Sequence, residues 1–181
     1  MRTSRLRPVL GALAAALAFT VLPAGSAVAA DSAPAAPAAS APSLAVTKLS
    51  HSQAASMFTS SGITWSSTGG CSDRNVSTCT SFEQINLATV QGAQTLKSAS
   101  GCAVHITGGT ETGHAGGTYS HWNGYKLDFH PYSCLSNYIT SAFTYIGTRS
   151  DGAALYEAAS GNLYARESNH WDVTFYSCGG C

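Results

Sequence analysis

Six cysteines constrain the fold of this 181-residue chain more than any other feature: Cys71, Cys79, Cys102, Cys134, Cys178 and Cys181. An even number of cysteines in a short exported chain indicates disulfides, and six cysteines allow fifteen pairings. We expect the pairs Cys71–Cys79, Cys102–Cys134 and Cys178–Cys181, with a Cys134–Cys178 bridge as the main alternative. In a competing interpretation, Cys178 and Cys181 form half of a zinc knuckle. The chain has no second cysteine pair at the spacing that such a zinc site needs.

The N-terminus predicts export. Three arginines within the first seven residues precede an apolar stretch over 8–22, and residues 27–29 read Ala-Val-Ala, a small-residue cleavage site. Together these features indicate a secretory signal peptide over 1–29. An Ala/Pro/Ser-rich linker or pro-segment follows over 30–43, and we expect the folded domain over 44–181. The mature protein is expected to be secreted, monomeric and without stable membrane insertion.

Charge argues against nucleic acid as a partner. The chain carries nine basic and nine acidic residues, and three of the basic residues lie in the signal peptide. The mature form therefore has a formal charge of −3. No run of three Lys or Arg occurs anywhere in the sequence. Non-specific binding to DNA or RNA needs a basic surface, so this function class is excluded.

Hydrophobic patterning predicts an α+β domain in which a small antiparallel sheet has helices packed on one side. Ser50 and Ser81 each begin a Ser-x-x-Gln capping pattern, and a helical period follows Cys134. We expect helices over 50–58, 81–97 and 135–146. Alternating patterns predict strands over 102–107, 125–130, 153–158, 163–167 and 170–176, the third and fourth of them as a hairpin.

Candidate catalytic chemistry is concentrated in two short segments. His121 lies in a loop, Asp128 lies on the polar face of the following strand, and Gly124 permits a sharp turn between them. Glu167 and His170 lie three residues apart at the start of the last strand. Two imidazoles and one carboxylate form a three-ligand zinc set with an open fourth position, the composition of a catalytic site. A separate glutamate can then serve as the proton acceptor of a hydrolase.

These segments resemble a known family. Ile106-Thr-Gly-Gly109, Ser120-His-x-x-Gly-x-x-x-Asp128 and Glu167-x-x-His170 are similar to motifs of the zinc D-alanyl-D-alanine peptidases. These cell-wall enzymes are related to lysostaphin-type endopeptidases and to the hedgehog N-terminal domain. The resemblance covers about residues 101–176. It implies a hedgehog-like fold, Zn²⁺ as the cofactor, a peptidoglycan peptide as the substrate and a location at the bacterial cell wall.

The resemblance also assigns roles: His121, Asp128 and His170 would be the zinc ligands, and Glu167 the general acid and base. Many family members carry an arginine where this chain has Thr110 and Glu111. Because a carboxypeptidase needs a cation for the terminal carboxylate, an endopeptidase is favoured over a D,D-carboxypeptidase. None of Arg74, Arg149 and Arg166 lies in that loop. The lysostaphin branch also has a histidine at the position that Ser168 occupies here.

Other residues leave alternatives open. His114 either steadies the oxyanion or is a solvated loop residue. His130 is favoured as a surface or supporting residue over a ligand. Trp122 could line a peptide groove, whereas Tyr125 and Trp171 are favoured as core. The alternative to an enzyme is a non-catalytic, zinc-stabilised binding module of hedgehog-like fold.

Overall fold

The computed structural model describes residues 46–176, which belong to one compact unit, Ser43–Cys181. The expected signal peptide, the linker and the Cys178–Cys181 pair lie outside these residues, so those expectations stay predictions. No helix of the described part is long and apolar enough to cross a membrane.

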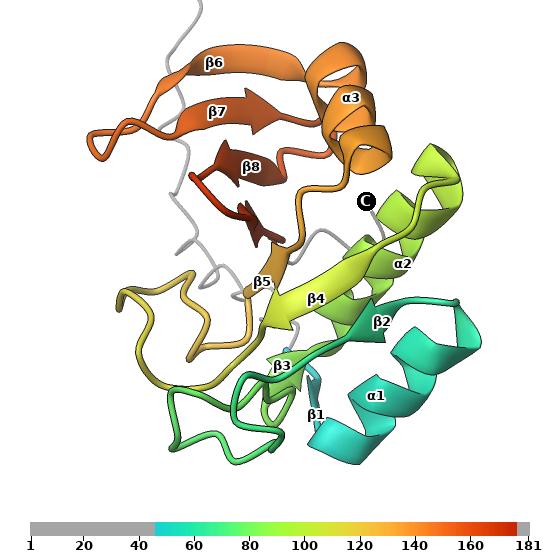
Figure 1. The fold of residues 1–181 in the computed structure, drawn as a ribbon, viewed down its shortest axis with the longest axis vertical. Coiled ribbons are helices and arrows are strands. Elements are labelled where there is room, and N and C mark those ends of the chain that lie inside the picture. Colours follow the sequence, from blue (N-terminus) through green and yellow to red (C-terminus); the bar gives the residue numbers. More distant parts are fainter. Residues whose placement is uncertain (1–45, 177–181) are drawn as a thin grey trace, which may run out of the picture. The chain divides into compact units, whose positions relative to one another are not determined.

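The described unit is an α+β fold with three helices and a mainly antiparallel seven-stranded sheet (Figure 1). The helices are α1 (His51–Ser60), α2 (Leu87–Ser100) and α3 (Ser133–Ala142). The sheet has the order β2-β4-β5-β9-β8-β7-β6, in which only the β2–β4 pair is parallel. Its strands are β2 (Thr64–Trp65), β4 (His105–Gly108), β5 (Lys126–Phe129), β6 (Thr144–Thr148), β7 (Ala154–Glu157), β8 (Leu163–Arg166) and β9 (Trp171–Thr174). Two further short strands, β1 (Lys48–Leu49) and β3 (Ile85–Asn86), pair antiparallel with each other.

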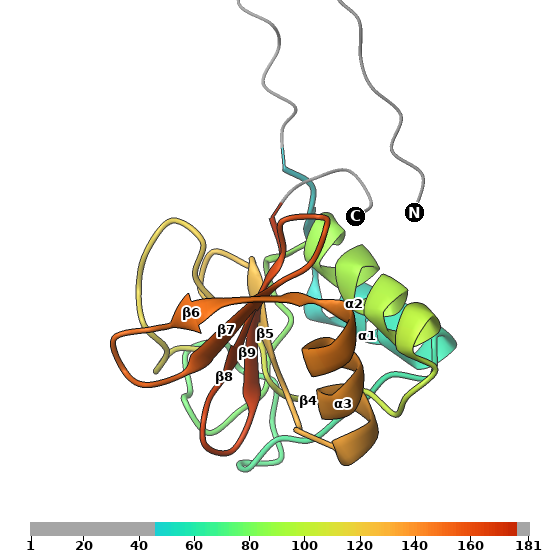
Figure 2. The same ribbon diagram turned by 90° about the horizontal axis from the view of Figure 1, so that it is seen from above.

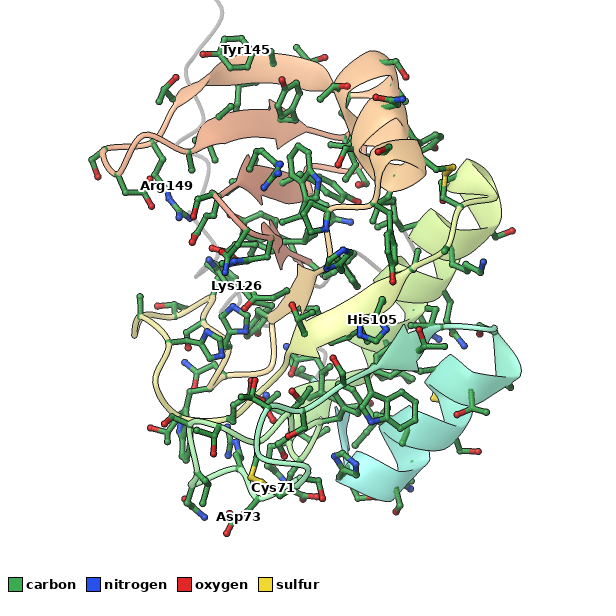
Figure 3. The ribbon with its side chains drawn as sticks, viewed as in Figure 1. Cys71, Asp73, His105, Lys126, Tyr145 and Arg149 are labelled. Carbon is green, nitrogen blue, oxygen red and sulfur yellow. A yellow bond between two sulfur atoms is a disulfide. The ribbon has the colours of Figure 1, made fainter. Side chains whose placement is uncertain are left out.

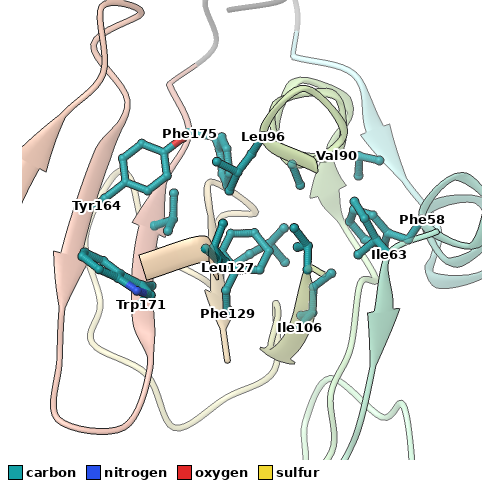
Figure 4. Packing of buried hydrophobic residues seen from close by; sticks show 14 of the residues in the cluster. Phe58, Ile63, Val90, Leu96, Ile106, Leu127, Phe129, Tyr164, Trp171 and Phe175 are labelled. Carbon is teal, nitrogen blue, oxygen red and sulfur yellow. The ribbon is translucent and has the colours of Figure 1, made fainter. Parts of the chain in front are cut away.

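All three helices cover the same face of the sheet (Figure 2), as the sequence predicted. The core between the two layers combines side chains of the helices with alternate side chains of the strands (Figure 4). Phe58 and Leu96 from the helices pack with Leu127, Trp171 and Phe175 from the sheet. This burial of apolar surface is the main stabilising contribution to the fold.

The strand register places two carboxylates on the other face of the sheet. Leu127 pairs with Val173, whereas Asp128 pairs with Asp172 on the neighbouring strand. Because side chains alternate along a strand, the two aspartates point away from the helices. The face opposite the core therefore holds charged side chains close together at the centre of the sheet.

Helix α1 begins as predicted, whereas α2 does not. Ser50 and Gln53 form a capping box at the start of α1. The pattern at Ser81 caps no helix, and α2 begins only at Leu87. The backbone N–H of Ser81 instead donates to the buried carboxylate of Glu111, and Gln84 adopts a positive φ of 63°. Tertiary hydrogen bonding therefore replaces the local capping pattern here.

The third predicted helix is too long. We expected it to continue to residue 146, but α3 ends at Ala142 and β6 follows at once. Residues 144–148 pair antiparallel with β7, which uses their backbone groups in the sheet. The helical spacing of the apolar residues did not reveal this pairing, because the pairing depends on β7, which lies further along the chain.

Two disulfides are present among the described residues, and both match the expected pairs. Cys71 is joined to Cys79, and Cys102 is joined to Cys134. The first closes a short loop, whereas the second connects the segment before β4 to the first turn of α3. The alternative Cys134–Cys178 bridge is wrong, because Cys134 is already bonded.

Candidate metal centre

Asp128, on β5, lies at the centre of the candidate site. This residue is buried, at 6% exposure, on a strand that lies between β4 and β9. The oxygen Oδ1 has no hydrogen-bond partner, but it lies 3.3 Å from His121 Nε2 and 3.4 Å from His170 Nε2. A buried carboxylate is costly without positive charge or a donor beside it, and the two imidazoles can supply that charge as imidazolium or by sharing a metal ion.

His121 is oriented by the loop that precedes β5. The Gly124 N–H donates to the His121 carbonyl, and Gly124 has a φ of 77°, which favours glycine. A Cβ at Gly124 would also lie 2.5 Å from the carbonyl oxygen of Gln84. The His121 Nδ1 donates to the Gly109 carbonyl at 2.7 Å, which leaves Nε2 free to bind a metal.

Two carboxylates stabilise positive charge at His121. Burial lowers the pKa of this imidazole, but the nearby carboxylates of Asp128 and Asp172 outweigh burial and raise the pKa to about 9. The same two carboxylates would favour a metal ion bound at Nε2, because they stabilise positive charge whether a proton or a metal carries it.

Glu167 and His170 lie in the turn between β8 and β9. The Glu167 N–H donates to the His170 carbonyl, which closes the turn. His170 Nδ1 lies 2.8 Å from Asn169 Oδ1, so it can donate there and present Nε2 to the cavity. Glu167 Oε2 lies 3.3 Å from that Nε2. The turn therefore brings His170 to Asp128 and Glu167 to His170.

His114 also reaches the site. Its Nδ1 lies 3.7 Å from Asp128 Oδ2, and its ring stacks on His121 at 3.8 Å between centroids. Its Nε2 lies 3.2 Å from Glu111, a buried carboxylate that also accepts from the N–H groups of Ser81 and Gly109. Burial raises the pKa of Glu111, but these hydrogen bonds outweigh it and lower the pKa. His114, His121 and Asp128 form a group that could hold a metal ion.

Four charged residues that line the cavity were not predicted from the sequence: Lys126, Arg149, Asp151 and Asp172. Asp172 is bound by Lys126 at 2.7 Å and by Arg149 at 2.9 Å, and Figure 3 labels both cations. Burial raises the pKa of Asp172, but hydrogen bonds and charge from His121 and Lys126 lower it well below its usual range. Alternation along the last strand could have indicated Asp172, which shares a face with His170.

Arg149 had no local signal, because it follows β6, a strand that was itself not predicted. Its guanidinium hydrogen-bonds to Asp151, Asp172 and Glu167. The pKa of Arg149 is raised, first by the hydrogen bonds to Asp151 and then by the other two carboxylates. The loop after β4 contains no arginine, but the fold brings Arg149 to the site from the end of β6.

These side chains line one cavity of about 530 Å³. Four carboxylates and two cations are among the residues that line it, a formal charge of −2 before the histidines are counted: Asp128, Asp151, Glu167 and Asp172 against Lys126 and Arg149. A divalent cation would balance this charge.

The remaining candidate residues lie around or outside this cavity. Trp122 is 45% exposed, and the guanidinium of Arg74 lies 3.7 Å from its ring. Trp171 is buried in the core, as expected, whereas Tyr125 is half-buried. His130 contacts the rings of His105 and Tyr132 and does not line the cavity.

No family model, no curated protein and no solved structure matches this chain.

Proposed function

We propose that this protein is a secreted zinc peptidase that hydrolyses a peptide bond in bacterial peptidoglycan. The observation that carries the proposal is the buried Asp128 Oδ1, which lacks a hydrogen-bond partner and faces the Nε2 atoms of His121 and His170. Two histidines and one carboxylate, with the fourth position left for water or substrate, form a ligand set of catalytic zinc.

The two distances from Asp128 Oδ1 to the imidazole nitrogens fit a tetrahedral ion. Ligand atoms bound about 2.0–2.1 Å from a tetrahedral zinc are about 3.3 Å apart. Asp128 Oδ1 lies 3.3 and 3.4 Å from the two imidazole nitrogens. The Gly109 carbonyl and Asn169 hold the opposite nitrogens of the two rings, which is the usual support for zinc-binding histidines.

The stacking of His114 favours His170 as the third ligand. An imidazole binds a metal in its ring plane, and His114 is stacked within 16° of parallel on His121. Two stacked rings cannot both direct a lone pair at one ion unless one of them turns. We therefore assign His114 to a supporting role, in which it faces the second oxygen of Asp128 and can donate to a substrate oxygen.

Glu167 is the proposed proton carrier. Bound zinc supplies a Lewis acid that polarises a carbonyl and activates water at neutral pH. The carboxylate of Glu167 lies next to the ligand nitrogen of His170, and Arg149 holds its other oxygen. In this position Glu167 can take a proton from the attacking water and deliver it to the leaving amine.

The charges of the cavity support an endopeptidase over a carboxypeptidase. Among the described residues, Arg149 is the arginine that lines the cavity, but Asp151, Asp172 and Glu167 already surround it. A terminal carboxylate would have to compete with three carboxylates for this cation. A blocked or internal peptide bond carries no such charge and avoids this repulsion.

Support for a cell-wall substrate comes from the family resemblance and from the compartment. The motifs around His121, Asp128, Glu167 and His170 are similar to those of cell-wall peptidases, and they surround one cavity here. The two disulfides fit an oxidising compartment, in agreement with the predicted signal peptide.

The test combines metal analysis with digestion of purified peptidoglycan. We expect one zinc per chain, which the variants Asp128→Ala and His170→Ala lose. Glu167→Gln should retain zinc and lose at least about 100-fold in turnover, because an amide cannot accept the proton. Glu157→Gln, an exposed glutamate outside the cavity, is the matched control and should match the wild-type protein.

Mass spectrometry of the digested wall identifies the bond. Cleavage inside cross-linked peptides supports the endopeptidase, whereas release of only terminal D-Ala from a pentapeptide contradicts it. Zinc binding without cleavage of any peptide bond would contradict the enzyme and favour the non-catalytic binding module. Full activity after exhaustive chelation would refute a metal-dependent reaction.

A further inference from the structure

A second hollow, of about 260 Å³, adjoins the candidate site. It shares Lys126, Arg149 and Asp172 with the site cavity, so the two hollows are direct neighbours. The hollow extends from these charged residues over strands β7, β8 and β9.

The floor of the hollow is apolar, although it belongs to the face of the sheet that points away from the helices. Leu155 pairs with Ala165, which pairs with Asp172 on β9. Leu163 pairs with Thr174 in the same way. Paired residues share a face, so these apolar side chains lie on the same side as the proposed metal ligands. An antiparallel sheet with one face on the core usually exposes polar residues on the other, so this apolar floor calls for a function.

Aromatic rings form one wall. Tyr119 and Tyr176 line the hollow, and their rings meet edge to face at 4.7 Å. Tyr119 also packs against Tyr125 at 5.0 Å, yet it is 48% exposed. The ring contacts fix Tyr119 in place while one side of it stays accessible. Fixed, partly exposed aromatic rings are typical of binding surfaces.

The charges at the inner end of the hollow compensate one another. Lys126 binds the buried carboxylate of Asp172, and Arg149 binds Asp151 and Glu167 as well as Asp172. Each cation already has a carboxylate partner, so neither would bind an acidic side chain strongly. Asp172 already has cationic partners, so it would not bind a basic side chain strongly. The hollow therefore favours a group without charge.

We propose that this hollow is a substrate subsite that binds an uncharged, apolar side chain next to the peptide bond that is cleaved. The proposal rests on the proposed peptidase function, because it takes the adjoining cavity as the place of cleavage. The occupant is one residue of a peptide, with its side chain on Leu155 and Leu163 and against the ring of Tyr119. Acidic and basic side chains are disfavoured, because the hollow offers them no free partner and would remove them from water.

Binding to the Glu167→Gln protein tests the subsite without cleavage. The probes are Ac-Ala-Leu-Ala-NH2, Ac-Ala-Asp-Ala-NH2 and Ac-Ala-Lys-Ala-NH2, each with the central residue in the L and the D form. Leucine methyl groups are observed by NMR, with buried Leu135 of α3 as an internal reference. We expect at least one form of the leucine peptide to shift Leu155 and Leu163 but not Leu135. It should bind at least about tenfold more tightly than the charged peptides.

Three variants at two tyrosines provide a matched comparison. Tyr119→Ala should weaken binding of the leucine peptide about tenfold, and Tyr119→Phe should restore it, because the ring makes the contact. Tyr145→Ala removes a tyrosine that is 56% exposed on β6, outside the hollow, and should leave binding unchanged. Equal binding of the charged peptides, or no response at Leu155 and Leu163, would overturn the subsite.

The subsite and the peptidase function can fail separately, because the NMR experiment does not measure turnover. Peptide cleavage by the wild-type protein without a response of the two leucines overturns the subsite alone. If the two leucines respond but the wild-type protein cleaves no peptide, the hollow is still a peptide-binding site, and the proposed peptidase function is refuted.

Discussion

Gly108→Ala should weaken metal binding while leaving the fold in place. Gly108 pairs with Asp128 across β4 and β5, and a Cβ at this glycine would lie 2.5 Å from Asp128 Oδ2 and 3.1 Å from Cγ. Because Cβ atoms essentially never approach a neighbour within 3.0 Å, the carboxylate must move by at least about half an ångström. In metal sites, the distance between the metal and each ligand atom varies by only about 0.2 Å.

The expected loss follows from this displacement. Changes in the groups that orient metal ligands typically reduce metal affinity about 10–100-fold, which corresponds to about 1.4–2.7 kcal/mol. Zinc affinity is measured by competition with a chromophoric chelator, and circular dichroism of the metal-free protein reports the fold. Gly116→Ala is the matched control, because nothing lies within 4 Å of its added Cβ. If Gly108→Ala folds and binds zinc as tightly as this control, the assignment of Asp128 as a ligand is refuted.

Two further predictions concern stability. Replacing Cys102 and Cys134 by serine removes a link between residues 32 apart in sequence and should lower the free energy of unfolding by about 4 kcal/mol, from the loop entropy of the unfolded chain; a loss below about 1 kcal/mol in urea unfolding would contradict this. Replacing glycine by alanine inside a helix ordinarily stabilises it by about 1 kcal/mol. Gly92→Ala should instead destabilise the protein by about 1–3 kcal/mol, because the added Cβ would lie 2.4 Å from the Phe175 ring. Zinc affinity should not change in Gly92→Ala, and a more stable variant would show that the packing argument is wrong.

Local sequence determined those elements whose signals act over a few residues. The capping box of Ser50 and Gln53 starts α1, since both hydrogen bonds form within one turn of the chain. The hairpin of β7 and β8 was predicted for a similar reason, because its two strands are adjacent in sequence. The class of the fold followed from these patterns.

The Ser81 pattern and the end of α3 were mispredicted because distant groups compete for the same backbone. Ser81 donates to Glu111, thirty residues later, and residues 144–148 pair with β7. A hydrogen bond to a remote partner satisfies the backbone as well as a local one, and a single segment does not reveal which will form.

Sequence by itself identified the residue types of the candidate site: His121, Asp128, Glu167 and His170 were proposed from their spacing, and all four line one cavity. Only the tertiary structure placed Arg149 at the site, because its position depends on the pairing of β6 with β7. Only the tertiary structure likewise identified Asp172 as the partner of Asp128. Strand register is set by contacts between segments far apart in the chain, so the electrostatic surroundings of the site are decided by the assembled sheet.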